Sequence, residues 1–506
     1  MVKKKVIIVG AGIGGLGVAN LLAKAGYEVH VYEKDSQAGG RAGRKTEKGF
    51  TFDTGPSWYL MPEVFAHYYD LLGESVETEL KLDKLSPAYK VFFEHDEPVV
   101  ITGTLKKDAA TFELIEKGAG EQLRRYVENS KTIYRLALDH FLYTNFESIT
   151  DFTKKAILKK IGTLPMLLTK PIHSYVGKYV KNIHLKQILE YPMVFLGTSP
   201  FSAPAMYSLM SALDFDEGVY YPQGGMYTII ESLVSIGEEI GVQYHFNSEV
   251  KHISVSLGKV SGIQLKNNNE IIGADIVISN ADLHFTETSL LDERYQTYPQ
   301  KYWTNKEPGP SALLMYLGID KKVHELEHHN LLLVDAWKEN FDAIYATKTI
   351  PEKASIYVSV TSRTDPSVAP KGSENIFVLV PLPSDTELSS KEVDALATHY
   401  ITQIESMTGI DIKNNIVTKS IFKPSDFKDS FYSWRSSMLG QSHVLRQSAF
   451  FRTSNKSKKV DNLYYVGAST TPGIGLPMCL ISAELVYKRL VGNKSGGRVT
   501  KIESKL

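Results

Sequence analysis

Cysteine is nearly absent from this sequence, because Cys479 is the single one among 506 residues. One thiol cannot form a disulfide within the chain, which excludes a disulfide scaffold and favours a reducing compartment such as the cytoplasm. No run of 18 or more apolar residues occurs, so the chain is not expected to cross a bilayer. Net charge is lacking too, because 57 basic residues balance 57 acidic ones, and nucleic acid is therefore not an expected partner.

The rest of the composition is that of a folded protein. Hydrophobic residues make up 43% of the chain and charged residues 23%, close to the average for folded soluble proteins. At about 150 residues per domain, the length predicts either three units or two large ones. A single small binding module is excluded.

A glycine loop near the start of the chain is its clearest motif. The apolar run at 6–9 predicts a buried strand of a parallel sheet, and it leads into Gly10-Ala11-Gly12-Ile13-Gly14-Gly15. A helix is expected at 16–25 and a second strand at 27–32. In such a loop the first glycine permits the turn, the second admits a pyrophosphate and the last lets the helix pack on the strand. The helix N-terminus then presents unpaired amides to the phosphates.

An acidic residue stands at the end of the second predicted strand. Glu33 follows 18 residues after Gly15, where a carboxylate can accept hydrogen bonds from both hydroxyls of an adenosine ribose. Strand, glycine loop, helix, strand and acid in this order predict a dinucleotide-binding unit. The alternative is an α/β turn that merely needs glycines.

The segments after Glu33 favour a flavin over a nicotinamide. Gly39-Gly40-Arg41-Ala42 and Phe52-Asp53-Thr54-Gly55-Pro56 resemble the flavin-dependent amine oxidase superfamily, in which a Gly-Gly-Arg segment lies beside the flavin and its diphosphate. A guanidinium held there can offset diphosphate charge; the alternative for Arg41 is a surface ion pair. The resemblance implies FAD as the cofactor, with Lys34, Gly40, Arg41, Pro56 and Ser57 among the residues that bind it.

A second glycine loop lies near the other end of the chain. Residues 462–477 predict a strand, a loop and the start of a helix, and they resemble the C-terminal signature of the bacterial phytoene desaturase family of carotenoid desaturases. The helix N-terminus would stabilise negative charge on a reduced flavin. Ser469 stands where the family has a glycine, and Thr470-Thr471 replaces its His-Pro ending. These departures bear on the subfamily and the substrate, and not on flavin binding. The resemblance implies flavin contacts by Gly467, Ala468, Gly475, Leu476 and Pro477.

Three middle segments extend the resemblance over nearly the whole chain. Val250 ends a segment, 246–250, that is similar to the strand whose valine backbone pairs with adenine in this superfamily. Residues 274–282 are similar to the strand that returns beneath the cofactor, and 221–225 also match in order. As patterns alone, these are only strands followed by turns.

The fold class expected is α/β, with a discontinuous Rossmann-like FAD-binding domain interleaved with an α+β substrate domain. The FAD-binding domain takes 1–100, 215–300 and 445–495. A helical membrane and substrate region takes 101–214, and the sheet and helices of the substrate domain take 301–444, with strands at 312–317, 356–360 and 376–380. A flexible tail is expected at 496–506.

A basic and apolar segment at 151–190 predicts a membrane-facing surface. It holds eight lysines against two acids, with apolar residues between them. Such a segment suits an anionic bilayer surface, and the alternative is a solvated helical face over an ordinary core. The first interpretation gives a monotopic protein, cytoplasmic and peripherally associated with the cytoplasmic membrane. The eight lysines are Lys154, Lys155, Lys159, Lys160, Lys170, Lys178, Lys181 and Lys186.

The function expected is FAD-dependent desaturation of a hydrophobic carotenoid. Histidines such as His328-His329 lack metal-ligand spacing, so no metal is expected, and the sequence assigns neither a catalytic residue nor an oligomeric state. A delocalised polyene cation needs no strong base to lose its proton. The 56–59 stretch and the altered C-terminal loop favour 3,4-desaturation of a 1-hydroxylated acyclic or monocyclic carotenoid, such as a hydroxylated γ-carotene. The alternatives are a phytoene desaturase, a non-redox flavin-dependent carotenoid isomerase, a carotenoid carrier and an amine oxidase.

Overall fold

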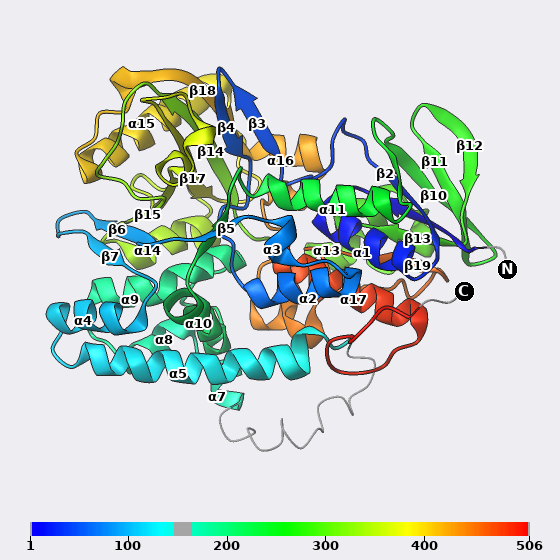
Figure 1. Ribbon diagram of the computed structural model, residues 1–506, viewed down its shortest axis with the longest axis horizontal. Helices are drawn as coiled ribbons and strands as arrows, with labels where there is room; N and C mark the ends of the chain where they lie inside the picture. Colours follow the sequence, from blue (N-terminus) through cyan, green and yellow to red (C-terminus); the bar gives the residue numbers. More distant parts are fainter. Residues whose placement is uncertain (1–2, 146–163, 504–506) are drawn as a thin grey trace.

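Five parallel strands form the sheet to which the first glycine loop belongs. The structure, a computed structural model, describes residues 3–145 and 164–503 (Figure 1). Segments from the start, the middle and the end of the chain meet in this sheet, as the interrupted nucleotide domain predicts. Its strand order is β19 (Leu463–Tyr465), β13 (Ile276–Ser279), β1 (Lys5–Val9), β2 (Glu28–Tyr32) and β9 (Gln243–His245).

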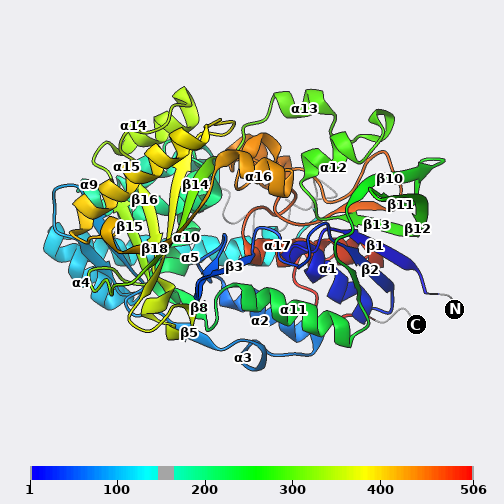
Figure 2. The ribbon, with the colours of Figure 1, turned by 90° about the horizontal axis from the view of Figure 1, so that it is seen from above.

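The parallel sheet is covered on both faces, which explains why β1 is wholly apolar in its buried part. Val6 and Ile8 pack on helices α1 (Ile13–Lys24), α11 (Tyr227–Glu239) and α17 (Leu476–Val491). Ile7 and Val9 face the other way, because side chains alternate along a strand. That face is covered by a three-stranded antiparallel sheet, which lies opposite the helices in Figure 2. Its strands are β10 (Val250–Ser256), β11 (Lys259–Leu265) and β12 (Asn268–Gly273).

A seven-stranded sheet forms the second half of the molecule. The strands expected at 312–317, 356–360 and 376–380 are all present in it, as β14 (Ser311–Ile319), β16 (Ile356–Ser359) and β17 (Glu374–Leu382). β15 (His329–Leu333) runs parallel to β6 (Tyr89–Phe93), and all other neighbours are antiparallel. The order is β18 (Ile416–Phe422), β14 (Ser311–Ile319), β17 (Glu374–Leu382), β16 (Ile356–Ser359), β15 (His329–Leu333), β6 (Tyr89–Phe93) and β7 (Val99–Ile101).

The two faces of this sheet have different roles. Leu313, Met315 and Leu317 of β14 pack with residues of α15 (Ser390–Thr408) in a closed core. Leu314 and Tyr316 point to the opposite face, toward a layer of helices from the first insertion. That layer contains α4 (Leu105–Ile115), α5 (Ala119–Ala137), α8 (Ile172–Val176) and α9 (Ile183–Glu190).

Shorter elements link these layers. Two small pairs of strands are β3 (Arg44–Glu47) with β4 (Phe50–Asp53), and β5 (Leu82–Lys84) with β8 (Tyr220–Pro222). The remaining α-helices of the described residues are α2 (Pro62–Leu72), α3 (Val76–Glu79), α7 (Leu164–Thr169), α10 (Met210–Ala212), α12 (Leu283–Ser289), α13 (Gln300–Thr304), α14 (Trp337–Asp342) and α16 (Pro424–Phe431).

Two segment boundaries differ from those expected from the sequence. β6 and the first two residues of β7 fall within 1–100, but both strands belong to the seven-stranded sheet, because β6 pairs with β15. At the other end, residues 496–503 make defined contacts. Lys488 Nζ donates to the carbonyl oxygens of Tyr143 and Gly497, and Val499 is buried.

The lysine-rich segment is described from residue 164 onward, and Lys154, Lys155, Lys159 and Lys160 lie outside the described residues. In the described part, Lys178 and Lys181 are exposed, while Ile172 and Val176 are buried in the core. This is the pattern of a solvated face over an ordinary core. Within 3–145 and 164–503, no helix combines the length and the apolar character needed to span a membrane.

Candidate active site

The first glycine loop joins β1 to α1 and has the close contacts that its glycines predict. Gly10 has φ +97°, a left-handed conformation that residues with a side chain rarely adopt. A Cβ on Gly15 would lie 2.2 Å from the carbonyl oxygen of Gly10, so no larger residue fits there without a shift of the turn. Gly12 caps α1 without a side chain. Among the described residues, no side chain therefore caps the first amides of α1, which lie beside a cavity that Gly12 and Gly14 line.

Glu33 stands at the end of β2 and lines the same cavity. Its Oε2 accepts a hydrogen bond from the Ala11 amide at 2.7 Å, and its Oε1 accepts one from the Asp35 amide at 3.0 Å. Burial raises the pKa of Glu33, while these two hydrogen bonds oppose the rise. Each carboxylate oxygen has a further lone pair, so Glu33 can still accept two more hydrogen bonds.

The second glycine loop lies against the first. Gly467 follows β19, and its Cα would be only 2.9 Å from a Cβ placed on Gly14. The side chain of Asn280, directly after β13, fills the remaining space, because a Cβ on Gly12, Gly14 or Gly467 would meet it within 2.7 Å. Asn280 thus spaces the two loops. Gly475 caps α17 with φ +116° and Pro477 lies in its first turn, so a second helix N-terminus faces the cavity.

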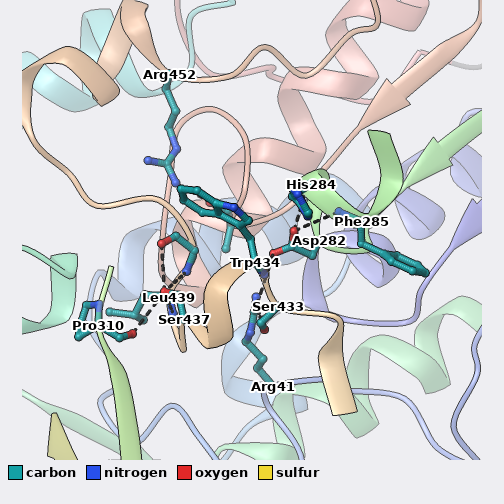
Figure 3. A network of polar contacts seen from close by, with 12 residues as sticks. Arg41, Asp282, His284, Phe285, Pro310, Ser433, Trp434, Ser437, Leu439 and Arg452 are labelled. Carbon is teal, nitrogen blue, oxygen red and sulfur yellow. Dashed lines mark hydrogen bonds and ion pairs between the residues drawn. The ribbon is translucent and has the colours of Figure 1, made fainter. Parts of the chain in front are cut away.

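Arg41 ties this region to the loop after α16, as Figure 3 shows. Its Nη2 donates to Ser433 Oγ at 2.6 Å and lies 3.9 Å from Asp282 Oδ2. Asp282 also caps α12 by accepting from the amides of His284 and Phe285. Burial lowers the pKa of Arg41. In the described chain, Arg41 Nε is buried without a hydrogen-bond partner.

A second arginine holds the second glycine loop from behind. Arg452 is 5% exposed, and its Nε and Nη2 donate to the carbonyl oxygens of Thr470 and Ala468 at 3.0 and 2.7 Å. Burial lowers the pKa of Arg452 to about 10, so the guanidinium remains charged at neutral pH. Arg452 therefore fixes the loop that carries Ala468.

His443 lines the cavity beside this loop. Its Nδ1 lies 3.1 Å from the carbonyl oxygen of Leu196, which can only accept, so Nδ1 carries the hydrogen. Burial and the charge of Arg452 lower the pKa of His443 well below its usual range, which keeps the ring neutral. Nε2 then bears a lone pair. It lies against Gly473, where a Cβ would approach it to 2.4 Å.

One cavity of about 1160 Å³ connects these groups with the second half of the molecule. We call its glycine-loop wall the cofactor side and its opposite wall the substrate side. The volume exceeds the roughly 300–1,000 Å³ typical of pockets for one small molecule, which suits a cofactor together with a long substrate. The substrate side is mostly apolar; its residues include Ile133, Ala137, Phe141, Leu167, Phe195, Leu314, Tyr316, Tyr357, Phe377 and Leu379.

The family of the chain follows from comparison with known proteins. A family model described as flavin containing amine oxidoreductase matches residues 13–486. The chain belongs to this family. Its fold is shared by the structure of an oxidoreductase from Methanosarcina mazei, which has 18% identity and a TM-score of 0.62 and covers 96% of this chain and 100% of that one.

Relatives of the chain include carotenoid desaturases, as the sequence motifs predict. The chain is similar to a carotenoid 3,4-desaturase of Haloarcula japonica, with 38% identity over 96% of this chain and 98% of that protein. A zeta-carotene-forming phytoene desaturase of Myxococcus xanthus is 33% identical over 96% of this chain and 94% of that protein. A 1-hydroxycarotenoid 3,4-desaturase of a Flavobacterium species is 32% identical over 95% of this chain and 98% of that protein. The protein is therefore an oxidoreductase of the carotenoid desaturase group, acting on CH–CH bonds.

The cofactor side of this flavin oxidoreductase fits the group that its family implies. Two helix N-termini and the glycine amides can hold a diphosphate. The unpaired Nε of Arg41 is a buried donor that an anionic group beside it would satisfy. A Cβ on Gly12 or Gly14 would add bulk to the cavity wall at the point where a pyrophosphate has to approach.

Most residues predicted to bind the cofactor lie together on the wall of the cavity. Gly15 and Gly467 stand behind that wall, in the contacts described above. Sequence reasoning missed Ser433 and Arg452, which lie in irregular segments without a motif. Asn280 and Asp282 fall within the predicted strand segment 274–282, but only the sheet order shows their role. The predicted residues that line the cavity are Gly10, Gly12, Ile13, Gly14, Glu33, Lys34, Gly40, Arg41, Pro56, Ser57, Val250, Ala468, Gly475, Leu476 and Pro477.

Proposed function

We propose that this protein is an FAD-dependent carotenoid desaturase that forms the 3,4 double bond of a 1-hydroxylated acyclic or monocyclic carotenoid. The observation that carries the proposal is the continuity of the cavity, which joins both glycine loops to a long apolar wall. An apolar wall of this kind suits an isoprenoid chain. The two relatives named as 3,4-desaturases support the position of the double bond. Glu33 supports the choice of FAD as the cofactor, since its carboxylate can accept hydrogen bonds from both hydroxyls of the adenosine ribose.

The residues of the chain have two tasks in this reaction. The residues of the cofactor side would hold a flavin, which when bound would supply the acceptor for the hydride that leaves one carbon of the substrate. The substrate side holds the polyene against the cofactor side and keeps water away, for which Leu314, Phe377 and Leu379 are suited. His443 Nε2 can receive the proton that leaves the neighbouring carbon. A weak base is sufficient there, because the cation on the polyene is delocalised and readily loses a proton.

We also propose that the enzyme takes its substrate from the cytoplasmic membrane surface. Leu445, Phe450 and Phe451 line the cavity and are 37%, 47% and 59% exposed. Exposed large apolar side chains at the opening of an apolar cavity suit contact with lipid. Replacing Phe450 and Phe451 by serine should weaken binding to anionic liposomes, measured by flotation; unchanged binding would speak against this route.

Product analysis tests the proposed reaction. The protein is expressed in cells that accumulate either a 1-hydroxylated carotenoid or phytoene. The products are separated, and their molecular masses are determined by mass spectrometry. Loss of two hydrogens from the hydroxylated compound is expected, with a longer-wavelength absorption because conjugation is extended. Desaturation of phytoene alone would favour the alternative supported by the Myxococcus relative. An altered geometry at unchanged mass would favour an isomerase.

A further inference from the structure

A group of polar side chains interrupts the apolar substrate side. Tyr357 of β16 and Trp58 both line the cavity. The hydroxyl of Tyr357 lies 2.7 Å from Nδ1 of His329, which is fully buried on the neighbouring strand β15. Burial raises the pKa of Tyr357, and the side chains of Ser359, Ser57 and Trp58 around its hydroxyl oppose that rise. These five residues form what we call the Tyr357 cluster.

The Tyr357 cluster contains more hydrogen-bonding capacity than it uses. Trp58 Nε1, His329 Nε2 and Ser359 Oγ are buried and have no hydrogen-bond partner among the described residues. Buried polar atoms are normally paired, because leaving one unpaired costs free energy. Burial lowers the pKa of His329 well below its usual range, so the ring is neutral. If its Nδ1–H donates to Tyr357, the Tyr357 hydroxyl is free to donate to a ligand.

We propose that the Tyr357 cluster binds the hydroxyl group at the end of the carotenoid and thereby determines substrate specificity. An alcohol oxygen accepts two hydrogen bonds and donates one. Tyr357 and Trp58 Nε1 supply the two donors. Ser57 Oγ supplies an acceptor, since its own hydrogen is directed to the carbonyl oxygen of Gly55 at 3.2 Å. This inference rests on the proposed function and adds the part of the protein that recognises its substrate.

The electrostatics of the cluster favour an alcohol over an amine or a carboxylate. The negative charge of Asp53 acts on Tyr357. However, the two carboxylate oxygens of Asp53 already accept hydrogen bonds from the backbone amides of Met226 and Tyr227, at 2.8 and 3.1 Å. No charged partner for an ionic ligand belongs to the cluster, and burying an unpaired charge is costly. A neutral oxygen is therefore the ligand that the cluster suits.

The position of the cluster also fits the bond to be oxidised. Ser57 and Trp58 directly follow Pro56, which lines the cavity beside the cofactor side. Two further rings pack against Trp58: the His329 ring lies parallel to it with 4.3 Å between ring centroids, and the Tyr89 ring is tilted by 57° with 5.5 Å between centroids. A hydroxyl on C1 is separated from C3 by a single methylene. A substrate anchored here would hold its C3–C4 bond on the part of the wall next to Pro56, and its chain can extend along the residues of α5 and α7 that line the cavity.

Binding of a matched pair of ligands tests the inference. The flavin-loaded protein is titrated in detergent with a 1-hydroxylated acyclic carotenoid and with the same polyene lacking the hydroxyl, and the two Kd values are compared. We expect the wild type to prefer the hydroxylated ligand by roughly tenfold, the value of one net neutral hydrogen bond. Tyr357→Phe should remove most of this preference, and Trp58→Phe should reduce it.

A matched control is available on the same wall of the cavity. Tyr316 lines it too, and its hydroxyl donates to the carbonyl oxygen of Thr54 at 3.0 Å. Tyr316→Phe removes a tyrosine hydroxyl outside the cluster and should leave the Kd ratio at the wild-type value. Retained flavin absorbance shows that each variant is folded.

The outcomes separate this inference from the proposed reaction. A wild-type Kd ratio near one, or a ratio that persists in Tyr357→Phe, would overturn the role of the cluster even if desaturation occurs. A tenfold ratio that is lost in Tyr357→Phe supports the role. It does so even if product analysis shows no new double bond, because that result would instead remove the proposed reaction.

Discussion

The two walls of the cavity are built in different ways. On the cofactor side, two short loops bring backbone amides and glycines together, and a Cβ on Gly14 would already be 2.9 Å from Gly467. On the substrate side, side chains from separate strands and helices form the wall, and Tyr357 and Leu379 meet only because β16 pairs with β17. The first wall depends on backbone geometry, and the second depends on which side chains the tertiary fold brings together.

This difference determines which substitutions each wall tolerates. A loop without side chains at the contact has no room for change, whereas an apolar wall accepts substitutions of similar volume. The carotenoid desaturase relatives carry different substrate names while matching nearly the full chain. We therefore expect mutations on the cofactor side to act on the flavin, and mutations on the substrate side to act on carotenoid turnover.

The largest effect is expected from Gly15→Ala on the cofactor side. The new Cβ would lie 2.2 Å from the Gly10 carbonyl oxygen, so the turn must move. We expect loss of bound flavin and of all turnover, and a decrease of about 1–3 kcal/mol in the free energy of unfolding. Flavin absorbance after gel filtration measures the first effect. In the control Gly177→Ala, the Cβ would have no neighbour closer than 3.4 Å, and flavin content should stay normal. Equal flavin content in both variants would contradict the account of this wall.

The second prediction concerns an acid behind the substrate side. Asp214 is buried, and its Oδ2 accepts the hydroxyls of Tyr89 and Tyr191 at 2.8 and 3.1 Å. Burial raises the pKa of Asp214 to about 7. Because the folded pKa lies above the unfolded value near 4, ionisation destabilises the fold, and stability is lost as pH rises from about 4 to about 7.

Asp214→Asn should remove this pH dependence. Between pH 4 and 8, the wild type should lose roughly 3–4 kcal/mol more than the variant. Urea unfolding at several pH values measures the difference, and comparing the two proteins cancels the other titrating groups. Parallel stability curves would show that Asp214 does not titrate in this range. On the cofactor side, by contrast, two backbone amides oppose the rise of the Glu33 pKa.

Leu379→Trp tests whether a change on the substrate side leaves the cofactor side intact. Leu379 lines the cavity, so a larger ring there occupies space that the polyene needs. We expect carotenoid turnover to fall by roughly 10- to 100-fold, since a small displacement of the reacting carbons has effects of this size. Flavin content should not change. Leu257→Trp, at a fully exposed turn, is the control and should retain activity. Loss of flavin from Leu379→Trp would break the division between the walls.

The two walls also differ in how far the sequence predicts them. The two glycine loops and Glu33 were predictable because the strand, loop and helix around each loop are made by residues close in the chain. β14, β16 and β17 were predictable as strands, but which of their side chains reach the cavity depends on the order of seven strands. β6 was assigned to the wrong half, because an apolar run does not indicate its partner strand. Arg452 and Ser433 gave no signal, since irregular segments carry no periodicity.

The smallest effect is expected from Glu33→Gln, which sharpens the account of the cofactor side. The glutamine side chain keeps the shape of the glutamate, but its NH2 group must face one of two backbone N–H groups, that of Ala11 or that of Asp35. We expect flavin affinity to fall by about tenfold, the value of one net hydrogen bond. Burial raises the pKa of Glu33, so wild-type affinity should also decline as pH falls through a value above the usual range for a glutamate. Because glutamine does not titrate, the variant should lack this decline. Titration of the flavin-free protein with FAD at several pH values measures both effects, and an identical pH profile in the two proteins would show that another group governs flavin binding.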